Sequence, residues 1–278
     1  MTIIEYIKIQ KLQFNNMQID ISLNKQEIFA VYSRNEEIVN DFLLVLNGIN
    51  PNNGSCLYLN KDIFDNEDFF KQRIYINFKE SYLKTINAEF IEESLMNRFN
   101  LSFNKEVFNT YVQEMGIRLE TTFKANYTFT DKGNTMVNFA FLKALNIPFI
   151  TVNNPTIYLK KAKIIETITN SLVDKRKYES IILGLDRIKN FKEKLERVLV
   201  FTDYQTYVIV NPQKDSFLLI EDNIHLHDKM FRTKKMGLVI CLNTYTKEEL
   251  KRFNHFKLKY RKLSFYEIED YFGDDNEK

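Results

Sequence analysis

The side chains of this chain that could bind a phosphate lie between a short apolar run, EIFAVY, and an amphipathic run, NDFLLVLNG, within residues 27–54. A strand, a loop and a helix in this order form the frame of a phosphate-binding P-loop. Such a loop needs glycines so that backbone N–H groups wrap a phosphate, a lysine for the β- and γ-phosphates, and a hydroxyl for Mg²⁺. The side chains in the loop therefore decide which chemistry is available.

The spacing after the loop resembles the first nucleotide-binding stretch of ABC-transporter ATPases, whose helix ends in Leu-x-Gly and is followed by Pro-x-x-Gly. The matching residues are Leu46, Gly48, Pro51 and Gly54. In the alignment that this resemblance implies, the residues in place of the three glycines are Ser33, Glu36 and Ile38. Those in place of the lysine and the hydroxyl are Val39 and Asn40. Taken alone, the stretch is equally compatible with an unrelated strand–loop–helix unit.

Two adjacent carboxylates, Glu36 and Glu37, stand where the phosphates would lie. At 4 Å, one pair of like charges costs roughly 4 kcal/mol at an effective dielectric constant near 20. We therefore expect the loop to repel a triphosphate, and we expect neither a cofactor nor a metal at this site. ATP and Mg²⁺ are expected only where a partner supplies the site.

Three further motifs of that family are matched in order, but without their chemical residues. The run FITVNNPT resembles the strand that ends in Asp-Glu-Pro-Thr, so Asn153 replaces the Asp that holds Mg²⁺ and Asn154 replaces the catalytic Glu. Lys79 stands in place of a Gln that links Mg²⁺ to the transport channel, and Asp186 in place of the switch His. The resemblance therefore implies a cassette that keeps the frame and has lost its catalytic residues.

The signature segment of the family, Leu-Ser-Gly-Gly-Gln, corresponds to TDKGN at residues 130–134, ahead of a helix predicted over VNFAFLKAL. Gly133 is kept and is followed by Asn134. Phe14 falls near the place where the family stacks an aromatic ring on adenine, although a core or edge aromatic is the alternative interpretation.

The same resemblance implies a groove in the helical subdomain that receives a short helix of the membrane subunit. The aromatic residues expected to line it are Phe78, Tyr82 and Phe90. The alternative for each of them is packing in the core of the helices.

The predicted fold is α/β, with a P-loop-NTPase-like, mostly parallel sheet, an antiparallel β-subdomain and a helical subdomain over about 81–145. The antiparallel part begins with strands at 3–9 and 19–23. This cassette-like region covers residues 1–200. Residues 201–278 form a C-terminal region with strands at TYVIV, SFLLI and MGLVICL and a closing helix over 263–272, capped by Ser264.

Composition narrows the possible partners. The chain of 278 residues has a net charge of +2, so charge alone favours neither nucleic acid nor anionic lipid. No apolar run approaches 18 residues and the N-terminus has no signal-peptide pattern, so we expect a cytoplasmic protein without direct membrane insertion. Cys56 and Cys241 lie in apolar runs and are expected as buried thiols. His225 and His227 could begin a metal site, but no third ligand is evident.

Three functions fit these observations. The first is a non-catalytic cassette that is a structural or regulatory subunit of a bacterial ABC transporter, held at the inner face of the membrane by a permease. The second is an asymmetric pair in which this chain lends its signature face to an active ATPase, with weak or no homodimer formation. The third is a free-standing cytoplasmic binding protein. The absence of the catalytic residues argues against a self-sufficient enzyme.

Overall fold

The computed structural model describes most of the cassette-like region and parts of the C-terminal region. The described residues are 5–50, 53–80, 88–99, 101–118, 130–191, 193–201, 206–210, 212, 215–220, 230–233, 237–242, 246–255 and 260–268.

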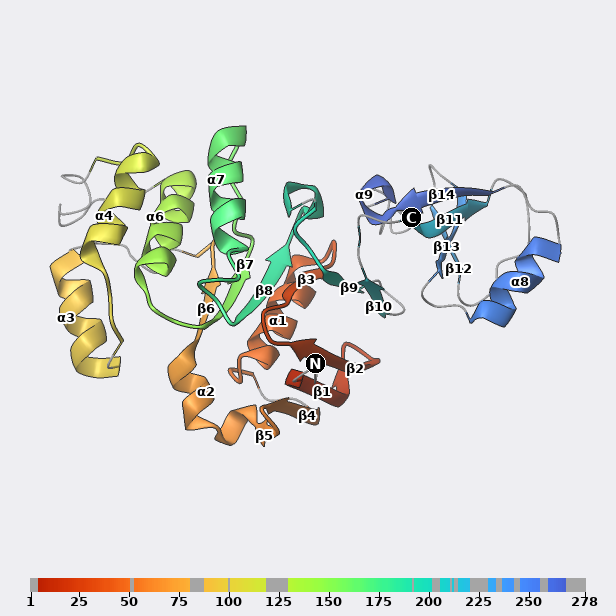
Figure 1. Ribbon diagram of the computed structural model, residues 1–278, viewed down its shortest axis with the longest axis horizontal. Helices are drawn as coiled ribbons and strands as arrows, with labels where there is room; N and C mark the ends of the chain where they lie inside the picture. The colour runs from red at the N-terminus through yellow and green to blue at the C-terminus, as the bar shows by residue number, and fades with distance from the viewer. Residues whose placement is uncertain are drawn as a thin grey trace.

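A six-stranded sheet lies at the centre (Figure 1). Its strands, in spatial order, are β10 (Thr206–Val210), β9 (Arg197–Phe201), β3 (Ile28–Tyr32), β8 (Ser180–Leu185), β7 (Phe149–Asn153) and β6 (Arg73–Asn77). The five strands from β9 to β6 are parallel, and β10 pairs antiparallel with β9. The predicted mostly parallel sheet is confirmed. The TYVIV strand, which the sequence placed with the C-terminal region, is part of this sheet as β10.

A second, antiparallel sheet forms the N-terminal subdomain, as predicted. Its order is β2-β1-β4-β5, formed by β1 (Glu5–Phe14), β2 (Met17–Asn24), β4 (Asn53–Tyr58) and β5 (Lys61–Asp62). A 3₁₀ turn, η1 (Ile63–Asp65), and α2 (Glu67–Gln72) then lead back into β6. Against the predicted 3–9 and 19–23, β1 continues to Phe14 and β2 begins at Met17, because pairing resumes after a register shift between Ile9 and Leu12 and continues up to a tight turn at residues 15–16.

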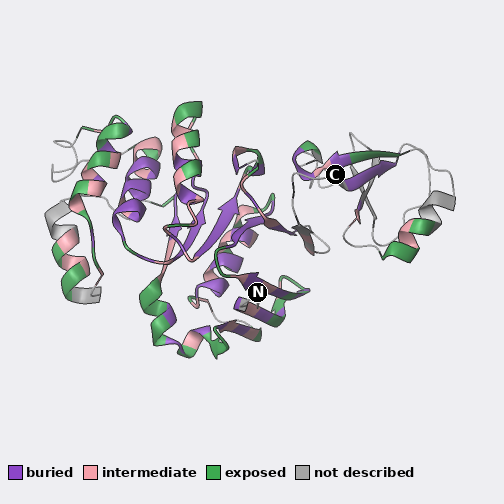
Figure 2. Ribbon diagram, viewed as in Figure 1, coloured by how far each residue is buried: buried purple, intermediate pink, exposed green. Residues whose placement is uncertain are grey.

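The two faces of the central sheet pack against different layers, as β3 shows by strict alternation. Phe29 and Val31 join a core with the antiparallel sheet and α1 (Glu36–Leu46). Ala30 and Tyr32 join a core on the opposite face, with α6 (Asp131–Ala144) and α7 (Ala162–Leu172). Figure 2 shows the buried residues concentrated in the central strands and the helix faces against them. Every residue of β3 is buried, which is typical of a strand covered on both sides.

Three helices gather at one end of the sheet, namely α3 (Ala88–Phe99), α4 (Lys105–Glu114) and α6 (Figure 1). The start of α6 differs from the prediction, because TDKGN is not a loop ahead of the helix. Thr130 is the N-cap of α6, and its hydroxyl oxygen accepts a hydrogen bond from the Gly133 N–H at 3.2 Å. Gly133 and Asn134 therefore lie in the first turn of α6.

The C-terminal region contains a third sheet, of order β12-β13-β11-β14. Its strands are β11 (Asp215–Ile220), β12 (Met230–Thr233), β13 (Gly237–Cys241) and β14 (Tyr260–Ser264), with α8 (Lys247–His255) between the last two. The closing helix was predicted from residue 263, but Leu263 and Ser264 still belong to β14, and α9 (Phe265–Ile268) follows. Glu267 caps its start by accepting from the Ser264 N–H at 2.8 Å. The predicted residues 269–272 lie outside the described part of the chain.

The C-terminal region contacts the central sheet through α9, beside the end of β3. Tyr32, the last residue of β3, contacts the ring of Phe265 edge-on, with 5.8 Å between ring centroids. Cys56 and Cys241 are buried free thiols, as predicted, whereas His225 and His227 lie outside the described residues. Among the described helices, none has the length and hydropathy needed to span a bilayer.

Candidate functional site at the carboxyl ends of the central strands

In the predicted phosphate loop, side chains of the loop accept hydrogen bonds from its own backbone N–H groups. Asn35 is the N-cap of α1, and its Oδ1 accepts from the Glu37 N–H at 3.0 Å. The Asn35 N–H donates in turn to Ser33 Oγ at 3.2 Å. Glu36 and Glu37 occupy the first turn, where a negative charge is favoured by the helix dipole. A phosphate at this helix start would use a free backbone N–H and the partial positive charge of the helix. Here the Glu37 N–H already donates to Asn35, and the carboxylates of Glu36 and Glu37 offset that partial charge.

Val39, at the predicted lysine position, faces the core and is only 3% exposed. It packs where α1 crosses β8 at Gly184. A Cβ atom at Gly184 would lie 2.8 Å from Val39 Cγ1, 2.6 Å from Leu43 Cδ1 and 2.4 Å from Asn153 Oδ1. The absence of a side chain at Gly184 therefore allows α1 to approach the sheet this closely.

The register of three strands brings the remaining predicted positions together. Asn77 of β6 pairs with Asn153 of β7, and Asn153 pairs with Gly184 of β8, so the three residues form one row across the sheet. Asn40 of α1 lies over this row. Its Oδ1 accepts from Asn77 Nδ2 at 3.3 Å, from Asn153 Nδ2 at 3.4 Å, and from the hydroxyl of Tyr75. We call Asn40, Asn77 and Asn153, with Tyr75, the amide cluster.

The amide cluster joins two residues that the sequence singled out, Asn40 and Asn153, and two that it missed, Tyr75 and Asn77. All three Asn side chains are uncharged, and Asn77 and Asn153 are 7% and 1% exposed. Tyr75 and Asn77 are alternate residues of β6, which indicates a shared face. Only the pairing of β6 with β7, however, places that face beside Asn153 and under Asn40.

Lys79 follows the amide cluster along the chain and forms an ion pair with Glu36, in the first turn of α1. Their side chains are 32% and 43% exposed. The Lys79 backbone N–H donates to Asn77 Oδ1 at 3.1 Å, so the same turn carries both contacts. The ammonium group of Lys79 therefore neutralises one of the two carboxylates in the loop.

Asn154 and Asp186 directly follow β7 and β8, and no hydrogen bond among the described residues joins them to the amide cluster. Asn154 is 3% exposed, with a left-handed φ of 53°, and its N–H donates to the Gly184 carbonyl at 2.9 Å. Asp186 Oδ1 is buried and has no hydrogen-bond partner within the described chain. The predicted catalytic and switch positions therefore lie just beyond the carboxyl ends of β7 and β8.

The other predicted site residues lie elsewhere. Phe14 is half-buried and packs edge-on against Phe42, at 5.3 Å between centroids, and against Phe201, at 5.5 Å, so it belongs to the core of the N-terminal subdomain. Phe78 is fully buried in the main core, and the prediction that it lines an accessible groove was wrong. Tyr82 lies outside the described residues, and Phe90 lies in α3 with its side chain outside the described part.

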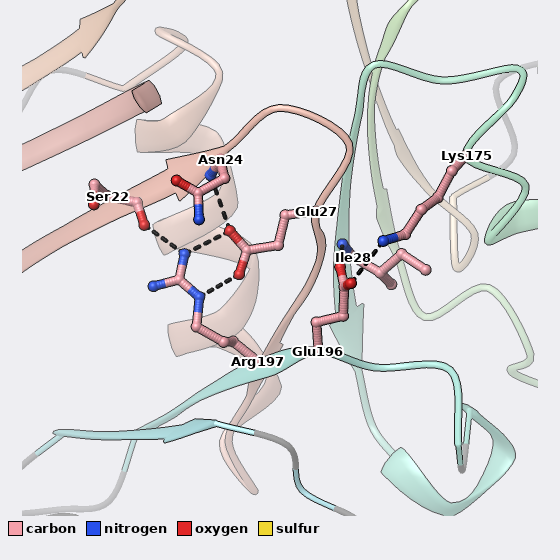
Figure 3. Close-up of polar contacts among 7 residues, drawn as sticks. All are labelled: Ser22, Asn24, Glu27, Ile28, Lys175, Glu196 and Arg197. Carbon is pink, nitrogen blue, oxygen red and sulfur yellow. Dashed lines mark hydrogen bonds and ion pairs between the residues drawn. The ribbon is translucent and has the colours of Figure 1, made fainter. Parts of the chain in front are cut away.

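Charged contacts are concentrated at the opposite edge of the sheet, at the amino ends of the strands (Figure 3). Arg197 holds the Glu27 carboxylate with two nitrogens, and Lys175 bonds Glu196 at 2.6 Å. Lys143 is also buried near that edge, and burial together with the charge of Lys177 lowers its pKa to about 8. No group of three or more His, Cys, Asp or Glu side chains in the described residues is arranged to hold a metal ion.

Comparison with known proteins finds the fold, but no sequence relative. No family model and no curated protein matches the chain. Among solved structures, cbiO1 from Clostridium perfringens, part of the ABC transporter complex cbiONQ, aligns with a TM-score of 0.57 at 16% identity, over 75% of this chain and 90% of that chain.

Two further structures agree with this match. The ATP-binding cassette MJ0796, in a dimeric post-hydrolysis state with ADP and Pi, aligns with a TM-score of 0.57 at 12% identity, over 74% of this chain and 98% of its own. The cassette MJ1267, in an ADP conformation, aligns with a TM-score of 0.54 at 14% identity, over 73% and 89%. The chain therefore has the α/β fold of ABC-transporter ATP-binding cassettes, with a parallel sheet and an antiparallel subdomain.

Proposed function

We propose that this protein is a catalytically degenerate cassette that acts as a structural or regulatory subunit of a bacterial ABC transporter. The observation that supports this proposal is the amide cluster together with the Lys79–Glu36 ion pair, at the place where the fold's phosphate loop and strand ends converge. Side chains of the chain itself fill the positions that the resemblance assigns to Mg²⁺ and phosphate.

The residues present do not fit a magnesium–triphosphate. Mg²⁺ prefers carboxylates, phosphates and water in an octahedral shell, whereas positions 40 and 153 offer neutral amides already bonded to each other. A phosphoryl-transfer site also needs positive charge at the developing negative charge. Here Val39, at the position of the lysine, is buried in the core, and Lys79 is paired with Glu36. The proposal therefore includes no nucleotide chemistry by this chain.

The proposed partner is a membrane permease, with or without an active cassette. The support is the fold itself, since cbiO1 is described as part of a transporter complex and has the same architecture. This chain keeps the helices α3, α4 and α6 beside the sheet, in the region where the resemblance places the permease contact. We propose a cytoplasmic protein held peripherally at the inner face of the membrane through that partner.

Nucleotide binding tests the first half of the proposal. Thermal unfolding is measured with and without Mg–ATP, with a motif-complete cassette as the positive control. A ligand present at 100 times its Kd stabilises the folded state by about 2.7 kcal/mol. We expect no saturable shift and no ATP turnover. Saturable stabilisation, or turnover that survives removal of contaminating ATPases, would contradict the proposal.

Membrane association tests the second half. At native expression, we expect the wild-type chain to sediment with membranes, and Tyr82→Asp with Phe90→Asp to release it without unfolding it. Phe70→Asp is the matched control, because Phe70 is an exposed aromatic residue, 39% exposed, on α2, away from the proposed groove. A wild-type chain found wholly in the soluble fraction would favour the free-standing binding protein instead.

A further inference from the structure

The turn after β6, residues 77–80, is tied to three other elements. The Phe78 N–H donates to the Asn153 carbonyl of β7 at 2.9 Å. The Glu80 carbonyl accepts from Asn138 Nδ2 of α6 at 2.9 Å, and the Glu80 N–H donates to the Asn77 carbonyl at 3.0 Å. This turn is where the chain leaves the central sheet toward α3, so its position sets the path into the helices.

The third tie is made by side chains, between the turn and α1. Lys79 pairs with Glu36, and Asn77 Nδ2 reaches both Asn40 Oδ1 at 3.3 Å and Glu80 Oε1 at 3.2 Å. The turn thus carries contacts to the phosphate loop, the neighbouring strand and the start of the helical region. The Lys79–Glu36 pair is the one charged contact among them, and it is partly exposed to solvent.

We propose that Lys79 is a positioning residue whose ion pair with Glu36 holds the turn 77–80 against α1, so that the exit from β6 toward the helices is fixed without a bound ligand. The inference rests on the proposed function, in which no nucleotide bridges the loop and the turn. A positive charge supplied by the chain takes the place of a ligand that would otherwise connect these two segments.

Hydrogen exchange of the amides of residues 78–80, in the full chain and without nucleotide, tests this proposal. Exposed ion pairs contribute little, so Lys79→Gln and Glu36→Gln are each expected to speed exchange by roughly two- to fivefold. The double variant should be no faster than either single variant, because the pair is already broken. Exchanging the charges, with Glu36→Lys and Lys79→Glu, should restore the slow rate.

Lys71→Gln is the matched control, because Lys71 forms a comparable exposed pair with Glu67 at 3.2 Å within α2. It should leave exchange at 78–80 unchanged. Unchanged exchange in both single variants, or a charge-exchanged variant that stays fast, would overturn the proposal.

Repeating the wild-type measurement with Mg–ATP separates this inference from the proposed function. We expect no added protection of the turn. Slower exchange with Mg–ATP, together with fast exchange in the single variants, would support the ion pair and contradict the absence of nucleotide binding.

Discussion

Arg197, the first residue of β9, and Glu27, just ahead of β3, form a two-nitrogen ion pair that closes the amino edge of the central sheet (Figure 3). The two side chains are 18% and 8% exposed. The pair also binds the end of β2. Glu27 Oε2 accepts from the Asn24 N–H at 2.9 Å, and Arg197 Nη2 donates to the Ser22 carbonyl. It therefore joins the antiparallel subdomain to the central sheet.

Arg197→Met is expected to destabilise the protein by about 3 kcal/mol, because it leaves the Glu27 carboxylate buried without its partner. Urea unfolding measures the change. Arg176→Met is the control, because Arg176 is 92% exposed and its pair with Asp174 should contribute little to stability. Adding Glu27→Leu to Arg197→Met should recover part of the loss. A loss as small as that of the control would show that the pair does not hold the edge.

Gly184→Ala is expected to cost about 1–3 kcal/mol, because the new methyl group meets three atoms at the α1–β8 crossing. The nearest are Asn153 Oδ1 at 2.4 Å, Leu43 Cδ1 at 2.6 Å and Val39 Cγ1 at 2.8 Å. Val39→Ala removes one of them, so the double variant should lose less stability than the sum of the two single variants. Strict additivity in urea unfolding would contradict this packing.

The sequence predicted the fold well where the pattern was local. The apolar runs of β3, β7 and β8 are typical of buried parallel strands, and the resemblance assigned Asn40 and Asn153 to the same site. For Phe78 the sequence left a groove and a core position open, because one aromatic residue at a strand end fits both.

The long-range side-chain contacts could not be predicted. The link between Lys79 and Glu36 joins residues 43 positions apart. The contribution of Asn77 depends on the register of β6 with β7, which is set by pairing of the strands and not by either sequence alone. The close approach at Gly184 depends on where α1 crosses β8. Tertiary packing decides each of these contacts.

Asn153→Asp, which restores the carboxylate that the resemblance expects, should destabilise the folded chain by about 2 kcal/mol at pH 7. Asn153 is 1% exposed and donates to Asn40 Oδ1, so the substitution sets one acceptor against another and adds a buried charge. Burial should raise the pKa of the new carboxyl in the folded state. The loss of stability is therefore fully present above that raised pKa. It disappears as the pH falls toward the pKa of the carboxyl group in the unfolded chain, near 4.

Chemical unfolding at pH 7 and at pH 4.5 measures this difference, and Asn16→Asp serves as the control. Asn16 is exposed in the turn between β1 and β2 and has a left-handed φ of 62°, which Asp tolerates. An Asn153→Asp variant as stable as the control at pH 7, or one that binds Mg²⁺, would contradict the description of the amide cluster as a buried, neutral network.

The lowered pKa of Lys143 predicts that the stability of the folded protein rises with pH in mild alkali. Burial, then the charge of Lys177, lowers its pKa in the folded protein from the usual value to about 8, against the opposing effect of Asp174. The unfolded chain therefore binds more protons between about pH 8 and about pH 10.5, and stability from this group increases across that window by up to about 3 kcal/mol.

Lys143→Met should flatten that increase and stabilise the protein relative to wild type at pH 7.5 more than at pH 9.5. Lys177 also has a lowered pKa through burial, so a smaller slope should persist. Lys247→Met, at an exposed position in α8, should leave the slope unchanged. Urea unfolding at the two pH values measures all three proteins. Identical slopes for wild type and Lys143→Met would show that the Lys143 ammonium is not buried in the folded state.

The purified chain is expected to be a monomer or a weak dimer. In the paired arrangement that the resemblance implies, the start of α1 in one chain would face the start of α6 in the other, with ATP between them. Each chain places Glu36 and Glu37 in the first turn of α1, and two copies would bring four carboxylates to that interface. Among the described residues, Lys79 forms an ion pair with one of these two carboxylates, Glu36. Sedimentation velocity at micromolar concentration, with and without Mg–ATP, tests this expectation. Glu37→Gln is the variant expected to strengthen any residual self-association.

A tight two-fold dimer formed through residues 33–41 and 130–135 would contradict the expected monomer or weak dimer. Stable association only with an active cassette or a permease would agree with this expectation.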